Sequence, residues 1–137
     1  MQPEIKKLSL RDTIMNRRGT PLVRLIHFVF GVAVRIFFRR IELFNSSVLP
    51  KESGIIFVSN HPNALIDPLL LFIALPRNIA FLAKSTLFKM PVVGFLIKAV
   101  GALPLYRQQD EGQDVSKNNE TFRLTRELLK SGGTIAI

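Results

Sequence analysis

The sequence contains no cysteine and no tryptophan, and it has a single tyrosine against eleven phenylalanines. The absence of cysteine excludes disulfide cross-links, thiolate zinc sites and cysteine nucleophiles from this chain. Hydrophobic residues nevertheless make up 47% of the 137 residues, whereas intrinsically disordered segments are poor in them. A chain of this length corresponds to one domain or less, and it is long enough to bury a core.

Acidic residues are scarce, and the basic residues that outnumber them are unevenly distributed. Nineteen Lys and Arg residues against ten Asp and Glu residues give a formal net charge of +9. Residues 1–40 contain nine basic and two acidic residues, so +7 of this charge lies in the amino-terminal segment. Such a segment favours an acidic partner, which leaves nucleic acid, anionic lipid headgroups and phosphorylated metabolites open.

No long uninterrupted apolar run is present, because two arginines divide the most hydrophobic stretch, residues 22–38. A transmembrane helix needs roughly 20 consecutive apolar residues. At about 100° per residue, Arg24 and Arg35 fall on one line of a helix, with His27 and Gly31 close to that line. The spacing therefore predicts an amphipathic helix with a narrow polar stripe and a wide apolar face.

We expect this helix to lie at a membrane interface and to make the chain membrane-associated, on the cytoplasmic face. Arg24 and Arg35 would contact lipid phosphates, while Phe28 and Phe37 would enter the acyl chains, so anionic lipids are an expected partner. A core helix with two arginines that reach solvent, and a true membrane span, are the alternatives. Nucleic acid is not an expected partner, because these basic residues punctuate an apolar helix and tryptophan for base stacking is absent.

Beyond a turn-rich stretch at residues 45–54, short apolar runs alternate with helical patterns. The runs predict strands at residues 55–58, 79–83, 102–106 and 134–137. The patterns predict helices at 68–75, 85–99 and about 117–130, with Pro91 starting a fresh turn within 85–99. This alternation predicts an α/β domain. We therefore divide the chain into a basic amphipathic helical region, residues 1–44, and part of a domain, residues 45–137, which we expect to be truncated because the sequence ends inside a predicted strand.

The residues richest in chemistry follow the first predicted strand, at 58–68, where α/β proteins commonly place active sites. A turn over residues 62–66 would bring His61 towards Asp67, and a histidine held by a carboxylate is suited to act as a general base. The alternative is purely structural: Asp67 caps the helix that Pro68 begins, and His61 only ends the strand. We expect no metal site, because cysteine is absent and His27 is the only other histidine.

The sequence Asn60-His61, followed by Asp67-Pro68 after five intervening residues, resembles the first block of the glycerol-phosphate and lysophosphatidate acyltransferase superfamily. In that family a His followed after four or five residues by an Asp forms the catalytic dyad. The resemblance implies that His61 is the general base and that Asp67 orients it. Asn60, or backbone N–H groups at the start of the helix near Pro68, are candidates for stabilising the oxyanion.

Residues 83–88, Gly94 and residues 101–107 are similar to the second block of this family, which ends in an arginine implicated in binding the acceptor's phosphate. The resemblance implies this role for Arg107, and Lys84 could add charge to the same rim. The structural alternative for both is a solvated position at a strand end. The third block, a Phe-Pro-Glu-Gly type loop, is absent, so the resemblance covers about residues 40–137 and the first half of such a domain.

The resemblance implies an O-acyltransferase of phospholipid synthesis built on a mixed sheet flanked by helices. The acyl donor would be acyl-CoA or acyl carrier protein, the acceptor glycerol-3-phosphate or a lysophospholipid, and no permanently bound cofactor is expected. The alternative is a non-catalytic membrane-surface binding module that uses the basic helix. A hydrolase is disfavoured because the sequence has no Gly-x-Ser-x-Gly element.

Overall fold

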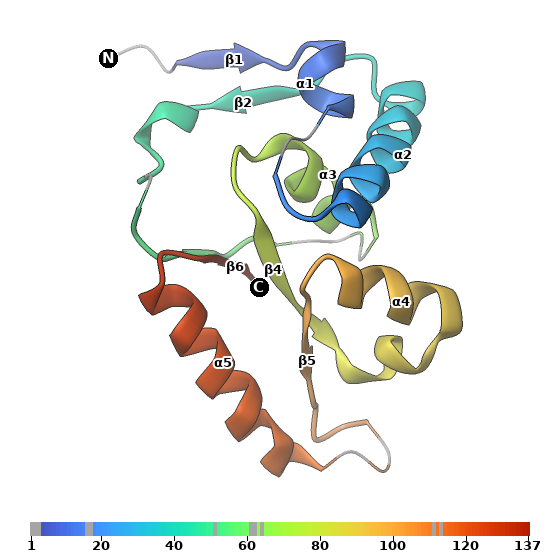
Figure 1. Cartoon of the computed structure of the whole chain (residues 1–137), viewed down its shortest axis with the longest axis vertical. Coiled ribbons are helices and arrows are strands. Elements are labelled where there is room, and N and C mark those ends of the chain that lie inside the picture. The colour runs from blue at the N-terminus through green and yellow to red at the C-terminus, as the bar shows by residue number, and fades with distance from the viewer. Residues whose placement is uncertain are drawn as a thin grey trace. The chain divides into compact units, whose positions relative to one another are not determined.

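The computed structural model describes residues 4–15, 18–50, 52–60, 63, 65–110, 112 and 114–137. The chain forms two compact units (Figure 1). The first consists of Met1–Lys51 and Asn60–Asn78, and the second of Glu52–Ser59 and Ile79–Ile137. The division of the chain after residue 44 that the sequence indicates stays a prediction.

The first unit combines a two-stranded ribbon with three helices. Strand β1 (Ile5–Lys7) pairs antiparallel with β2 (Glu42–Phe44). The helices are α1 (Leu10–Ile14), α2 (Pro21–Phe37) and α3 (Ile66–Ala74), and a 3₁₀ turn, η1 (Ser46–Val48), follows β2. Local sequence sets both early helix starts. Ser9 and Asp12 form a capping box on α1, and the Thr20 hydroxyl accepts from the Val23 N–H at 3.3 Å at the start of α2.

Helix α2 packs against α1 and α3 through the side that carries His27 and Gly31. His27 is 2% exposed, and its ring centroid lies 5.4 Å from that of Phe72 in α3. A Cβ added to Gly31 would lie 2.3 Å from the carbonyl oxygen of Thr13, so α1 approaches at a distance that only glycine permits. His27 and Gly31, which the sequence placed close to the line of the two arginines, are thus buried inside the unit.

Ile26 and Val34 are buried with these two residues, whereas most other apolar side chains of α2 are exposed. Side chains at this surface come from residues spaced three or four apart along the helix: Leu22, Leu25, Phe28, Val29, Val32 and Ile36. The helix was expected at residues 22–38 and forms at Pro21–Phe37. Within the part of the chain that the structure describes, no helix has both the length and the hydrophobicity to cross a membrane.

The second unit is an α/β layer built on a parallel sheet. Its strands are β3 (Ile55–Phe57), β4 (Ile79–Lys84), β5 (Leu103–Leu105) and β6 (Thr134–Ala136), in the order β3-β6-β4-β5. All three pairings are parallel, and β6 lies between β3 and β4 with Ile135 fully buried. The α/β prediction is confirmed, with four parallel strands where a mixed sheet was expected.

Helices and 3₁₀ turns connect these strands. They are η2 (Ser85–Lys89), α4 (Pro91–Ala99), η3 (Val115–Lys117) and α5 (Asn118–Lys130). The helical stretch expected at residues 85–99 forms two segments, in agreement with the fresh turn expected at Pro91. The break falls before Pro91, because a residue that precedes proline is driven out of the helical region, and Met90 is extended with φ −76° and ψ 130°.

Candidate functional site

The start of α3 holds Asp67 in a fixed position. One Asp67 carboxylate oxygen, Oδ2, accepts from the Asn63 backbone N–H at 3.0 Å. In return, the Asn63 side-chain oxygen accepts from the N–H groups of Leu65 and Ile66, at 3.1 and 2.9 Å. Asn63 therefore satisfies the orphan donors of the helix start, and Asp67 lies one residue inside the helix rather than at its cap. Sequence reasoning missed Asn63, although an Asn ahead of an apolar helix is a typical capping signal.

The proposed partner of Asp67 cannot be placed in the same way. His61 lies outside the described residues. Asn60 is described and exposed, just beyond β3 and the Ser59 N–H, which donates to the Ile137 carbonyl at 3.4 Å. The roles predicted for His61 and Asn60 therefore stay predictions.

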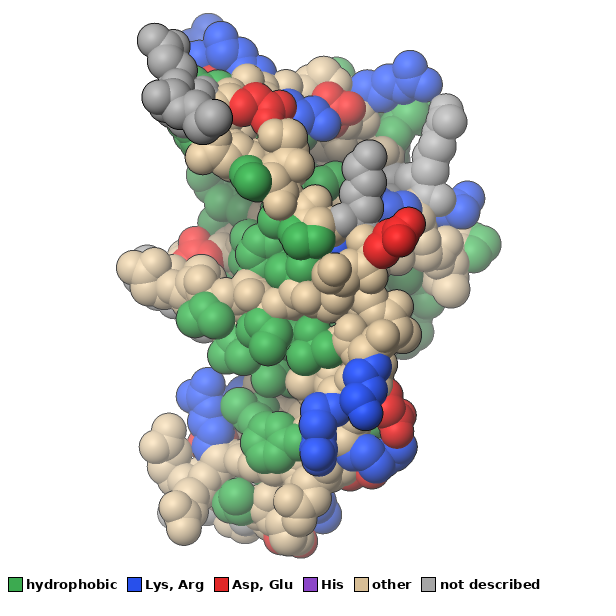
Figure 2. Space-filling view, turned by 90° about the vertical axis from the view of Figure 1, so that its left-hand side faces the viewer, with side chains coloured by type: hydrophobic (Ala, Val, Ile, Leu, Met, Phe, Trp, Pro, Cys, Tyr) green, Lys and Arg blue, Asp and Glu red, His purple; other side chains and the backbone are tan. Residues whose placement is uncertain are grey.

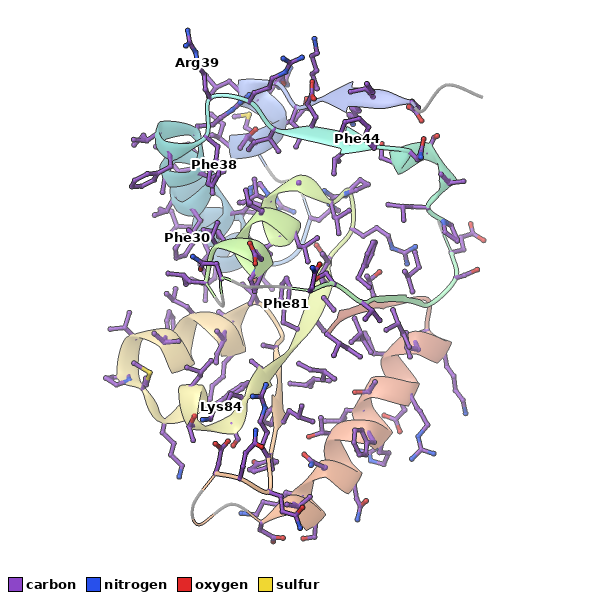
Figure 3. The ribbon with its side chains drawn as sticks, turned by 180° about the vertical axis from the view of Figure 1, so that it is seen from behind. Phe30, Phe38, Arg39, Phe44, Phe81 and Lys84 are labelled. Atoms are coloured by element: carbon purple, nitrogen blue, oxygen red, sulfur yellow. The ribbon has the colours of Figure 1, made fainter. Side chains whose placement is uncertain are left out.

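The two predicted phosphate-binding residues lie at the carboxyl end of neighbouring strands in the second unit. Lys84 is the last residue of β4 and is paired in register with Leu105, the last residue of β5. Arg107 follows two residues later and is exposed. Because β4 and β5 run parallel, both cations are at one edge of the sheet, where α/β folds commonly bind ligands. Figure 3 shows Lys84 at this end of β4.

Lys84 has an ion-pair partner that sequence reasoning missed. Its Nζ lies 2.7 Å from Oδ1 of Asp110, in the loop after β5. The Asp110 N–H donates to the Arg107 carbonyl at 3.1 Å, so a tight turn links the two loop residues. The polar run 108–114 contains three acidic residues, and nothing in the sequence indicates which of them pairs with Lys84.

The segment that carries Arg107 is held from α5. The side chain of Asn118, which is 8% exposed, accepts from the Tyr106 N–H at 2.9 Å and donates to the Tyr106 carbonyl at 2.8 Å. The Thr121 hydroxyl donates to the Pro104 carbonyl at 2.8 Å. Two side chains of one helix face thus bind the backbone at the end of β5, immediately before Arg107.

Asp67 belongs to the first unit, whereas Lys84 and Arg107 belong to the second. Within the second unit, Lys84 and Arg107 lie at the same edge of the sheet, because β4 and β5 run parallel. Among the described residues, no three His, Asp or Glu side chains are grouped so that they could hold a metal ion.

The residues predicted to contact a membrane differ in their surroundings. Arg24, Phe28 and Phe37 are exposed, Phe37 by 82%. Arg35 is partly buried and donates to the carbonyls of Leu8 at 2.6 Å and Arg39 at 3.5 Å. Part of the Arg35 guanidinium is therefore occupied within the first unit. The space-filling view in Figure 2 shows hydrophobic side chains exposed on another face as well, so exposed apolar area is not confined to α2.

Two curated proteins resemble this chain at low identity. One is an uncharacterised acyltransferase of Schizosaccharomyces pombe, 27% identical over 88 residues, which cover 61% of this chain and 13% of that protein. The other is the chloroplastic 1-acyl-sn-glycerol-3-phosphate acyltransferase LPAT1 of Arabidopsis thaliana, 25% identical over 99 residues, which cover 72% of this chain and 26% of that protein. The chain thus spans at most about a quarter of the length of these relatives. No solved structure matches it significantly.

Residues 40–137 match the sequence model of the Acyltransferase family, and this match takes in both blocks that the sequence analysis singled out. It covers well over half of the chain, together with the parallel sheet and the sheet edge that carries Lys84 and Arg107. The protein belongs to the Acyltransferase family.

Proposed function

We propose that this chain contributes to the transfer of a fatty acyl group from a thioester donor to a hydroxyl of glycerol-3-phosphate or a lysophospholipid. The observation that carries the proposal is the pair of cations, Lys84 and Arg107, at the ends of adjacent parallel strands. A phosphorylated acceptor fits such an edge, because guanidinium and ammonium groups bind phosphate through charge-assisted hydrogen bonds. The match to LPAT1, named for a phosphorylated glycerol acceptor, supports the same substrate class.

In the proposed reaction His61 removes the proton of the acceptor hydroxyl as its oxygen attacks the thioester carbonyl. The new O–C bond forms, the C–S bond breaks, and His61 returns the proton to the departing thiolate. General-base assistance of this kind contributes about 10²–10⁴-fold in rate. The acceptor is itself the nucleophile, so no covalent acyl-enzyme is required. Asn60 is proposed to stabilise the oxyanion that forms on the carbonyl.

The position of Asp67 supports its proposed role as the residue that orients His61. Its carboxylate is turned back to the N–H of Asn63, which is only two residues after His61 in the chain. Two residues extend the backbone by at most roughly 7 Å. A carboxylate within that reach can accept from one imidazole nitrogen and leave the other free to take a proton.

Substitution of each dyad residue in the full chain tests the mechanism. With acyl-CoA and glycerol-3-phosphate as substrates, we expect His61→Ala to lower turnover by about 10²-fold or more. Asp67→Asn should lower turnover less. It keeps an oxygen that can accept from the Asn63 N–H, and unchanged far-UV circular dichroism would show that α3 is retained. Turnover within a factor of two of the unsubstituted chain for His61→Ala would contradict the dyad.

A second function, binding to an anionic membrane surface, is supported by α2. Its exposed side presents apolar side chains, with Arg24 beside them, to solvent. Interfacial helices bind by burying such a face while arginines contact headgroups. The proposed substrates are lipids or their precursors, so contact between α2 and a membrane would serve the acyl transfer as well.

Co-sedimentation with vesicles that contain anionic lipid tests this function with matched substitutions. Phe28 and Phe122 are both 47% exposed, but Phe28 lies on α2 and Phe122 on α5. We expect Phe28→Asp to reduce vesicle binding and Phe122→Asp to leave it unchanged. Arg24→Glu and Arg126→Glu form a second matched pair with equal charge changes. Equal effects within both pairs would show that α2 is not the membrane-binding element.

A further inference from the structure

Lys84, the cation at the end of β4, is already in contact with an anion of the protein itself. The Asp110 carboxylate lies 2.7 Å from the Lys84 ammonium, and the Lys84 side chain is 40% exposed. An incoming phosphate therefore meets an ammonium with a bound carboxylate, not a free cation. This places two anions in competition for one lysine.

The Asp110 side chain is largely buried, unlike that of an ordinary surface ion-pair partner. Its side chain is 12% exposed, and its N–H is tied to the Arg107 carbonyl at 3.1 Å. Its second carboxylate oxygen, Oδ2, is buried and has no hydrogen-bond donor among the described residues. A buried carboxylate oxygen without a donor is costly. Among the described residues, the ion pair with Lys84 is the interaction that holds the Asp110 charge in place.

The turn also ties the backbone of Asp110 to that of Arg107. Asp110 is three residues after Arg107 and is hydrogen bonded to its backbone. Asp110 thus opposes phosphate binding at Lys84 by occupying a donor of its ammonium group.

We propose that Asp110 is a specificity-determining residue that lowers the affinity of this edge for phosphate by competing for Lys84. The inference rests on the proposed function, because it takes Lys84 and Arg107 as ligands of the acceptor's phosphate. In the free protein Asp110 occupies Lys84. When a phosphorylated acceptor binds, the ammonium exchanges one carboxylate contact for phosphate contacts, and only ligands that also engage Arg107 compensate for the exchange.

Titration of the full chain with glycerol-3-phosphate, followed by isothermal calorimetry, tests this competition. Asp110→Asn keeps the shape of the side chain and removes its charge, and we expect it to bind glycerol-3-phosphate about two- to fivefold more tightly. Asp110→Glu keeps a carboxylate and should retain the lower affinity. Asp114→Asn is the matched control, since Asp114 is in the same loop but accepts from Ser116 at 3.0 Å.

A double substitution assigns the effect to Lys84. In a Lys84→Ala background, Asp110→Asn should give no further gain in affinity, because the ammonium group for which Asp110 and phosphate compete is absent. Weaker or unchanged binding by Asp110→Asn, together with weaker binding by Lys84→Ala, would overturn the competition while leaving the phosphate site in place. Unchanged binding by both Lys84→Ala and Arg107→Ala would instead show that the proposed phosphate site itself is wrong.

Discussion

Removal of the Asn118 side chain is expected to loosen the segment that carries Arg107. Asn118 is the first residue of α5, and its amide spans both backbone polar groups of Tyr106, at 2.9 and 2.8 Å. Asn118→Ala removes both hydrogen bonds at a site that is 8% exposed. The Tyr106 N–H and carbonyl then lose their side-chain partner in a partly buried environment.

The expected loss of stability follows from these two bonds. A hydrogen bond of this kind contributes about 0.5–1.5 kcal/mol net, so Asn118→Ala should lower the free energy of unfolding by about 1–3 kcal/mol. Urea unfolding followed by far-UV circular dichroism measures this as a lower midpoint at an unchanged slope. Asn119→Ala is the control, because Asn119 is the next residue of the same helix and its side chain is exposed.

The same substitution should also weaken phosphate binding, since Arg107 directly follows Tyr106. We expect a several-fold higher dissociation constant for glycerol-3-phosphate with Asn118→Ala and no change with Asn119→Ala. Asn118→Asp separates the two bonds, because it retains an acceptor for the Tyr106 N–H but places a carboxylate oxygen against the Tyr106 carbonyl. Equal midpoints for Asn118→Ala and Asn119→Ala would refute the reasoning from these contacts.

Two further predictions concern the helix packing of the first unit. Gly31→Ala should destabilise the chain by about 2 kcal/mol, because overpacking against the Thr13 carbonyl outweighs the gain in helix propensity. The control Val29→Ala, on the exposed side of α2, should change stability little. Hydrogen exchange of the α2 amides would locate the effect. Burial lowers the pKa of His27 below its ordinary 6.5, with the charge of Arg18 adding to the effect. The unfolded chain therefore binds the proton first, so stability should fall as the pH drops below about 6.5, and His27→Gln should flatten this dependence.

Sequence predicted the second unit better than the first. The strands β3, β4, β5 and β6 follow from apolar runs bounded by turn residues, and their parallel order places Lys84 and Arg107 at one edge. The ribbon of β1 and β2 was not predicted, because each strand has only three residues and β1 contains two lysines. Asp110 and Asn118 were not predicted either. Their roles depend on which backbone atoms the loop and α5 bring within hydrogen-bond distance, and spacing alone does not determine that.

Helix α2 shows how far a periodic pattern can be interpreted without tertiary structure. The periodicity correctly predicts a helix, but it does not say which side faces the protein. The polar side was expected at a surface, yet Gly31 provides the close approach that α1 requires, and the neutral form of His27 packs against Phe72 at little cost in charge burial. The buried side of α2 also carries Ile26 and Val34, and the helix's remaining apolar side chains stay largely exposed. An exposed apolar surface of this kind is typical of an interaction site.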